Sequence, residues 1–168
     1  MEWRGIAGSF ENRVPRSGRG VLARAAWLLG LAVSVVDAFR AHLTPWQGTG
    51  VRALGVAVGL SGVLLRLWSM RTLAGASSYD LKVAEGQELV EAGPYRLVRH
   101  PSYTGMLLWS AGLGLWNPSL PGLLLLLPAT LAQLAQRIDV EERILAEHFG
   151  ARWEGYARRT SMVIPGIW

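Results

Sequence analysis

The sequence predicts an all-α integral membrane protein with about four transmembrane helices and a cytoplasmic C-terminal helical extension, all within a single domain over residues 1–168. Hydrophobic residues make up 51% of the chain and charged residues only 17%. The charges lie in blocks that flank apolar segments, and the run from Pro101 to Gln136 contains none. No alternation of strand and helix patterns and no glycine-rich strand-to-helix turn is present, which excludes a soluble dinucleotide-binding fold.

Composition also excludes several kinds of chemistry. The chain has no cysteine, so disulfides, cysteine nucleophiles and cysteine-ligated iron–sulfur clusters are ruled out. Its three histidines are scattered and form no metal-ligand pattern, so we expect no metal site. The net charge is +5, but the basic residues flank apolar segments. We therefore expect membrane lipids, and not nucleic acid, as their partners.

Four segments are expected to span the membrane, at residues 21–43, 51–69, 101–116 and 119–137. Residues 1–20 mix arginine with glycine, serine and proline and are expected to be loose or interfacial. The first span has a short uncharged core after arginines, as a signal peptide would, but no small-residue cleavage pattern follows it. In the second span, Gly55, Gly59 and Gly62 are spaced for close contact with another helix.

The uncharged run from Pro101 to Gln136 is too long for one span. Its 36 residues would form a helix of roughly 54 Å, against a hydrocarbon core of roughly 30 Å. The stretch from Asn117 to Gly122 contains two prolines and provides a turn, so we expect two antiparallel helices. The second of these should continue past the membrane from Arg137 and weaken at Gly150.

The distribution of cations predicts the topology. Arginine and lysine gather before the first span, between the second and third, and after the fourth, and are few or absent in the other two loops. By the positive-inside rule, both termini and the segments 71–100 and 138–168 lie in the cytoplasm. We therefore expect a multi-pass protein of the plasma or inner membrane.

One stretch, Gly93 to Gly105, combines two turns with many polar side chains. It reads Gly-Pro-Tyr-Arg-Leu-Val-Arg-His-Pro-Ser-Tyr-Thr-Gly, and Pro101 should begin a helix. The number of different donors exceeds what anchoring at a membrane surface requires, so we interpret the stretch as a ligand site. Arg96 and Arg99, in contrast, are expected to be anchors for lipid phosphates and topology.

Two sequence blocks together resemble the isoprenylcysteine carboxyl methyltransferase family of membrane enzymes and the related phospholipid methyltransferases. The first block is Tyr95 with Arg99-His100-Pro101-Ser102-Tyr103-Thr104-Gly105. The second is Glu141-Glu142-Arg143-Ile144-Leu145 with Phe149-Gly150-Ala151-Arg152-Trp153-Glu154-Gly155-Tyr156. The resemblance covers about the last eighty residues, and the combination of the two blocks is specific.

The resemblance implies S-adenosylmethionine as the methyl donor, with S-adenosylhomocysteine as the product. By position, it assigns donor binding to Leu89, Val90, Tyr95, His100, Pro101, Ser102, Tyr103 and Glu141. Glu142 is the runner-up for the donor's ammonium group, because helix-face arguments do not choose between the two carboxylates. Arg137 matches the family's substrate-contacting arginine, so Arg137 and Glu141 are the predicted catalytic residues. These two are four residues apart on one helix face and are also able to pair with each other.

The acceptor is expected to be lipid-like, such as a prenylcysteine or an alkylated phenol or pyrone. A carboxylate is ionised at pH 7, whereas a phenol or an ammonium group must first lose a proton. Since no base is obvious in the sequence, we expect an acceptor oxygen from a carboxylate or an acidic hydroxyl group. The alternatives are a phospholipid N-methyltransferase, a non-enzymatic membrane scaffold, and an NADPH-dependent sterol-type reductase. The reductases share a similar His-Pro-x-Tyr-x-Gly turn, but Ser102 and Met106 replace their usual Asn and Glu.

Overall fold

The computed structural model describes residues 18–37, 48–74, 88–117 and 119–167. Within these ranges the chain is helical and has no strand, which confirms the all-α prediction. The elements are α1 (Gly18–Val36), α2 (Thr49–Ala74), the short 3-10 helix η2 (Gly93–Arg96), α3 (Pro101–Trp116), α4 (Leu120–Phe149) and α5 (Ala151–Arg159).

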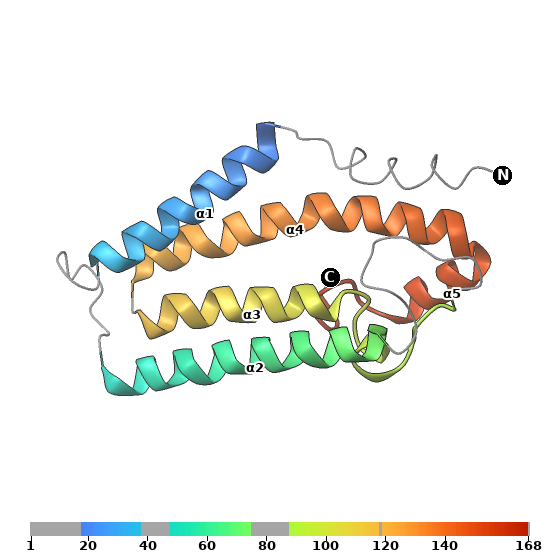
Figure 1. Ribbon diagram of the computed structural model, residues 1–168, viewed down its shortest axis with the longest axis horizontal. Helices are drawn as coiled ribbons and strands as arrows, with labels where there is room; N and C mark the ends of the chain where they lie inside the picture. The colour runs from blue at the N-terminus through green and yellow to red at the C-terminus, as the bar shows by residue number, and fades with distance from the viewer. Residues whose placement is uncertain (1–17, 38–47, 75–87, 118, 168) are drawn as a thin grey trace.

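The four long helices form one layer in the order α1, α4, α3, α2, because α1 packs on α4, α4 on α3 and α3 on α2 (Figure 1). The start of α1, the end of α2, the start of α3 and the end of α4 all point toward the same end of the layer. The helix α5 and the motif turn lie at that end. The fold therefore gathers the two sequence blocks on one side of the layer.

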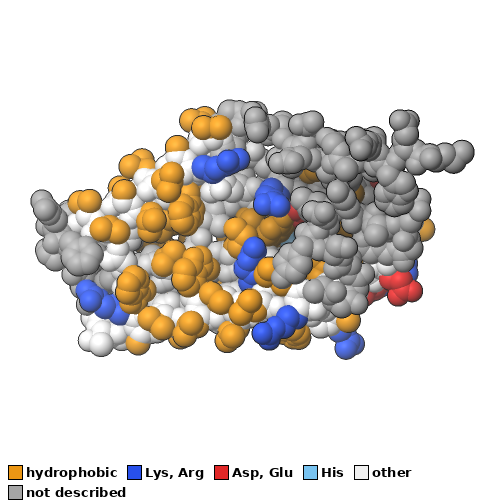
Figure 2. All heavy atoms as spheres, in the orientation of Figure 1, with side chains coloured by type: hydrophobic (Ala, Val, Ile, Leu, Met, Phe, Trp, Pro, Cys, Tyr) orange, Lys and Arg blue, Asp and Glu red, His pale blue; other side chains and the backbone are white. Residues whose placement is uncertain are grey.

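Two of the described helices are long and apolar enough to cross a membrane, namely Thr49–Leu73 and Leu120–Phe149. The apolar part of α1, Val21–Val36, is shorter, and α3 has 16 residues. Hydrophobic side chains are spread over the face of the layer seen in Figure 2, with several Lys or Arg side chains among them, and most of the visible acidic surface lies at the end that carries α5. This distribution agrees with an integral membrane protein.

Several boundaries differ from those predicted. The first helix begins at Gly18, inside the segment expected to be loose, and α2 continues to Ala74, beyond the predicted end at residue 69. Helix-forming residues continue to Ala74 without a break, and Arg71 in the last turn is favourable next to the helix C-terminus. Three parts of the predicted elements lie outside the described residues. They are residues 1–17 of the loose N-terminus, residues 38–43 of the first span and residues 75–87 of the cytoplasmic segment.

The helix start at Pro101 and the turn before α4 are confirmed. Proline occupies the first turn of both helices, where its missing N–H costs nothing. The Ser119 side chain caps α4 by accepting a hydrogen bond of 3.1 Å from the backbone N–H of Gly122. At the other end, α4 runs past the apolar segment as expected and stops at Gly150, whose φ of 52° favours glycine.

The close contact predicted for the glycines of the second span is confirmed, and its partner is α3. A Cβ atom added at Gly62 would lie 2.5 Å from the carbonyl oxygen of Gly105, and one added at Gly112 would lie 2.5 Å from the Cα atom of Gly59. At such distances only hydrogen fits. The small residues therefore bring the backbones of α2 and α3 into contact and place the start of α3 beside the end of α2.

Candidate active site

The backbone of the motif turn is held by the C-terminal segment. The N–H groups of Arg99 and His100 donate hydrogen bonds to the carbonyl oxygens of Ser161 and Met162, at 2.8 and 3.0 Å. Val98 and Ser161 form an isolated parallel bridge. The Thr104 hydroxyl group adds a bond of 2.6 Å to the carbonyl oxygen of Val163. We call Thr160–Val163 the C-terminal strap.

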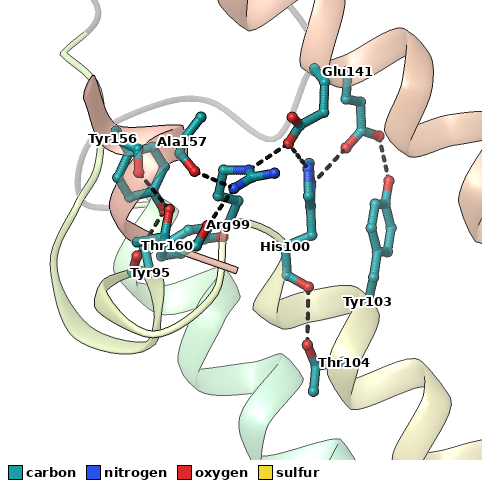
Figure 3. A network of polar contacts seen from close by, with 10 residues as sticks. Tyr95, Arg99, His100, Tyr103, Thr104, Glu141, Tyr156, Ala157 and Thr160 are labelled. Atoms are coloured by element: carbon teal, nitrogen blue, oxygen red, sulfur yellow. Dashed lines mark hydrogen bonds and ion pairs between the residues drawn. The ribbon is translucent and has the colours of Figure 1, made fainter. Parts of the chain in front are cut away.

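His100 lies between the two candidate glutamates (Figure 3). Its Nε2 atom is 2.8 Å from Glu142 Oε1, and its Nδ1 atom is 3.7 Å from Glu141 Oε2. The imidazole is buried, with 6% of His100 exposed, and it stacks near the Tyr103 ring with the centroids 5.6 Å apart. Residues from two distant parts of the sequence thus meet in one polar cluster, in agreement with the prediction that both sequence blocks contribute to one ligand site.

Glu141 also faces Tyr103 and Arg137. It accepts a hydrogen bond from the Tyr103 hydroxyl group, and its Oε1 atom lies 3.8 Å from Nε of Arg137, which confirms the expected pair. The Arg137 guanidinium is 5.9 Å from the centre of the Tyr103 ring, and its side chain is 52% exposed. An exposed arginine beside a mostly buried carboxylate is available to a bound ligand.

The expectation that Arg99 anchors lipid phosphates is wrong. Only 10% of its side chain is exposed. It donates hydrogen bonds to Glu142 Oε1 at 2.9 Å and to the carbonyl oxygens of Ala157, at 2.8 Å, and Thr160. A guanidinium group has five N–H donors in a planar fork, so it can tie α4, the last turn of α5 and the strap together, whereas a lipid phosphate would need it on the surface.

Tyr95 and Leu89, both assigned to donor binding, also contact α5. The carbonyl oxygen of Tyr95 accepts a hydrogen bond of 2.7 Å from the Tyr156 hydroxyl group. Leu89 is buried in a cluster with Trp153 and Tyr156. Burial and the nearby Glu141 raise the pKa of Tyr95 to about 12. Tyr95 is therefore neutral at pH 7, and its phenol group is a hydrogen-bond donor close to Glu141.

Ser102 contacts a candidate site residue, Arg66, that was not predicted from the sequence. Its hydroxyl oxygen accepts a hydrogen bond of 2.8 Å from the guanidinium group of Arg66 on α2. Among the described residues, Arg66 has no carboxylate partner within ion-pair distance. It is the only charged residue between Arg52 and Arg71. A lone charge within an apolar helix marks a functional residue by default, and this signal would have found it.

The predicted site residues thus fall into three groups. The side chains that meet in one polar cluster are His100, Tyr103, Arg137, Glu141 and Glu142. Ser102 faces α2, on the other side of the first turn of α3. Leu89 and Pro101 are buried, and Val90 and Tyr95 are half-buried. The part played by the strap was also missed, because backbone hydrogen bonds to an extended segment leave no sequence signature.

Glu142 lies past the apolar part of α4, and opposing influences act on its pKa. Burial alone would raise the pKa, but hydrogen bonds and charges from His100 and Arg99 outweigh it, and the pKa lies below the ordinary value of 4.5. A carboxyl group whose folded-state pKa is lowered contributes stability above its unfolded-state pKa. This contribution is lost as the pH falls through the lower, folded-state value.

We expect Glu142→Gln to reduce the free energy of unfolding by about 2 kcal/mol at pH 7, since hydrogen bonds to a charged group are replaced by weaker ones. The difference from the wild type should shrink as the pH falls below 4.5. Reversible unfolding in detergent at several pH values measures this difference in the free energy of unfolding. Glu154→Gln is the matched control, because the ion pair that Glu154 makes within the described part of the chain, with Arg158 on α5, is exposed. A penalty for Glu142→Gln that does not depend on pH would contradict this account.

Comparison with known proteins agrees with this arrangement. A family model described as phospholipid methyltransferase matches residues 51–152. The probable protein-S-isoprenylcysteine O-methyltransferase of Oryza sativa subsp. japonica is 30% identical over 179 residues, which cover 96% of this chain and 87% of the relative. The chain belongs to the isoprenylcysteine carboxyl methyltransferase family. The resemblance expected from the two sequence blocks is confirmed, and with it a membrane methyltransferase.

Other relatives of this chain differ in length and in name. Protein-S-isoprenylcysteine O-methyltransferase B of Arabidopsis thaliana is 31% identical, over 67% of this chain and 58% of the relative. The cobalt-zinc-cadmium resistance protein CzcN of Cupriavidus metallidurans is 31% identical, over 97% of this chain and 70% of the relative. The solved structure of a eukaryotic intramembrane Ras methyltransferase of this family superposes with a TM-score of 0.71 at 23% identity, over 90% of this chain and 54% of that one. The last comparison supports the fold.

Proposed function

We propose that this protein transfers a methyl group from S-adenosylmethionine to an oxygen atom of a lipid-like acceptor at the cytoplasmic face of a membrane. The observation that carries the proposal is the meeting of His100, Tyr103, Glu141 and Glu142 in one buried polar cluster. When bound, S-adenosylmethionine supplies an electrophilic methyl group on a sulfonium centre. It also carries an ammonium, a carboxylate and an adenine, which need a mixed set of polar and apolar partners.

The chain's own residues fit such a ligand. Among the residues that the structure describes, no basic side chain lies within hydrogen-bond distance of the Glu141 carboxylate, since His100 and Arg137 lie 3.7 and 3.8 Å away, so its charge is available to an ammonium group. Glu142 is already bonded to His100 and Arg99 and would hold the imidazole in place. Tyr103 and the Tyr95 phenol add donors. Most of the acceleration in methyl transfer can come from holding the two reactants in line, so these residues need only bind and orient.

We also propose four membrane crossings with both termini in the cytoplasm. The up-and-down order of α1 to α4 supports this count (Figure 1). The arginines that precede α1, follow α2 and follow the apolar part of α4 would then all lie on the side that carries the site. A lipid-like acceptor would reach the cluster from the bilayer.

Titration of the purified protein with S-adenosylmethionine and, separately, with NADPH tests the proposed function. We expect saturable binding of S-adenosylmethionine, strongly reduced in His100→Ala, and none of NADPH. Incubation with deuteriomethyl-labelled donor and either a farnesylated cysteine, an alkylated phenol or phosphatidylethanolamine then identifies the acceptor by mass spectrometry. Binding of NADPH alone would overturn the proposal in favour of a reductase, and binding of neither would favour a scaffold.

Arg66 provides a sharper test of the acceptor's charge. Together with Arg137 it flanks the first turn of α3, and positive charges on both sides favour an anionic acceptor. Loss of one charge-assisted hydrogen bond costs about 1.5–3 kcal/mol, so Arg66→Gln should raise the KM for a carboxylate acceptor about ten- to hundredfold and leave donor affinity unchanged. Arg71→Gln, an exposed arginine of the same helix, is the control. Equal effects of both variants would argue against this role.

A further inference from the structure

The C-terminal strap reaches back from α5 toward the apolar helices. Figure 1 shows the chain leaving α5 and turning back toward α3 and α4. Val163 is fully buried in a cluster with Tyr103, Leu134 and Ile138, with Met106 packed against it. Leu134 belongs to the uncharged part of α4, which ends at Gln136. The strap therefore crosses the boundary between the charged and the apolar parts of α4.

The residues after the strap form a tight, well-defined turn. The N–H of Ile167 donates a hydrogen bond of 3.1 Å to the carbonyl oxygen of Ile164, with Pro165 and Gly166 between them. Gly166 has a φ of 75°, as the third residue of a type II turn requires. Its N–H donates a further bond of 2.8 Å to the Ser161 hydroxyl group. The turn is thus tied to the strap and presents its side chains in a definite direction.

That turn exposes apolar side chains. Ile167 is 80% exposed and Ile164 is 37% exposed. No charged residue follows Arg159, whereas Arg158 and Arg159 on α5 have side chains that are 79% and 58% exposed. The polarity therefore changes sharply between the exposed face of α5 and the turn. Such a division, next to helices whose own apolar faces meet lipid, is the pattern of a segment at a membrane interface.

We propose that the turn Ile164–Ile167 inserts into the bilayer and docks the C-terminal strap on the membrane. The partner is the hydrocarbon edge of the lipid layer, since Val163, next to the turn, packs against Tyr103 of α3 and Leu134 of α4, and the turn carries no charge that would select a headgroup. The strap bonds the backbones of Arg99 and His100, so docking would hold the motif turn at a set depth. The inference does not depend on methyl transfer and would survive the failure of the proposed function.

The alternative occupant is the apolar tail of the acceptor, with the turn acting as a lid. The two partners differ in one measurable respect: a turn that inserts in lipid is shielded from water without acceptor, whereas a lid is shielded only when acceptor is bound. The exposed side chains of the turn take no part in the polar cluster, so substitutions there should leave the fold intact.

Because the 168-residue chain has no cysteine, a single one can be introduced and spin-labelled in that whole chain. We would label Ile167→Cys and Ile164→Cys in lipid nanodiscs, with Arg158→Cys on the exposed face of α5 as the matched control. Electron paramagnetic resonance saturation then compares collisions with oxygen, which partitions into lipid, and with a water-soluble nickel chelate. We expect an oxygen-to-nickel ratio several-fold higher at both positions of the turn than at Arg158.

Equal ratios at Ile167 and Arg158 would overturn the proposal, since the turn would then lie in water. A ratio that rises at Ile167 only after addition of a farnesylated cysteine would overturn it in favour of a lid. The unfolding temperature of each labelled protein, compared with that of the wild type, establishes that the strap remains in place.

Discussion

Glu141→Gln is expected to weaken S-adenosylmethionine binding by about ten- to a hundredfold while the protein stays folded. A charge-assisted hydrogen bond contributes about 1.5–3 kcal/mol, and about 1.4 kcal/mol corresponds to a factor of ten. The effect should fall on Glu141 because the basic side chains of His100 and Arg137 lie 3.7 and 3.8 Å away, which leaves the carboxylate able to accept a closer partner. Isothermal titration in detergent measures the change in Kd.

Glu142→Gln is the matched comparison, one residue along the same helix. Glu142 already accepts bonds of 2.9 and 2.8 Å from Arg99 and His100, so its loss should lower stability more than donor affinity. The two variants should therefore have opposite profiles, one with a raised Kd and the other with a reduced free energy of unfolding. A raised Kd for Glu142→Gln alone would reverse the two assignments.

Gly62→Leu is expected to destabilise the protein by about 3 kcal/mol, because the new side chain would collide with backbone atoms that have little freedom to move. Even a Cβ atom at this position would lie 2.5 Å from the carbonyl oxygen of Gly105 and 2.7 Å from the backbone nitrogen of Trp109. Separation of α2 from α3 would also break the bond between Arg66 and Ser102. The fraction of monodisperse protein and the unfolding temperature report this loss.

Gly50→Leu provides the control on the same helix, since nothing lies within 4 Å of a Cβ atom there. It should fold as the wild type does. If both variants behaved alike, the helix pair would tolerate a wider spacing than the contact of the two backbones implies.

Much of the candidate site could be predicted from the sequence, because its polar residues lie next to local signals that set where the helices begin and end. Proline at position 101 begins α3, glycine at position 150 ends α4, and the apolar run before Arg137 makes α4 continuous. These are properties of the backbone and of nearest neighbours in the chain. The pair of motif blocks was specific enough to predict the family, and the cation pattern led to one common side for both blocks.

The tertiary structure decided what each polar side chain does. Arg99 and Arg96 look alike in the sequence, yet Arg99 is buried against Glu142 and two carbonyl oxygens while Arg96 is exposed. Helix periodicity placed Glu141 and Glu142 on neighbouring faces and could not rank them. The two glutamates have different surroundings because Arg99 and His100 both lie within hydrogen-bond distance of Glu142.

By itself, then, the sequence determined the all-helical architecture, the membrane environment, the family and the two segments that form the site. Only the tertiary structure decided that Glu142, and not Glu141, bonds to both Arg99 and His100, that Arg66 reaches Ser102, and that the C-terminal strap holds the motif turn. The physical reason is that helix propensity and the periodic pattern of hydrophobic residues are set by residues close together in the chain. Hydrogen bonds and ion pairs between distant segments, in contrast, depend on how the helices pack.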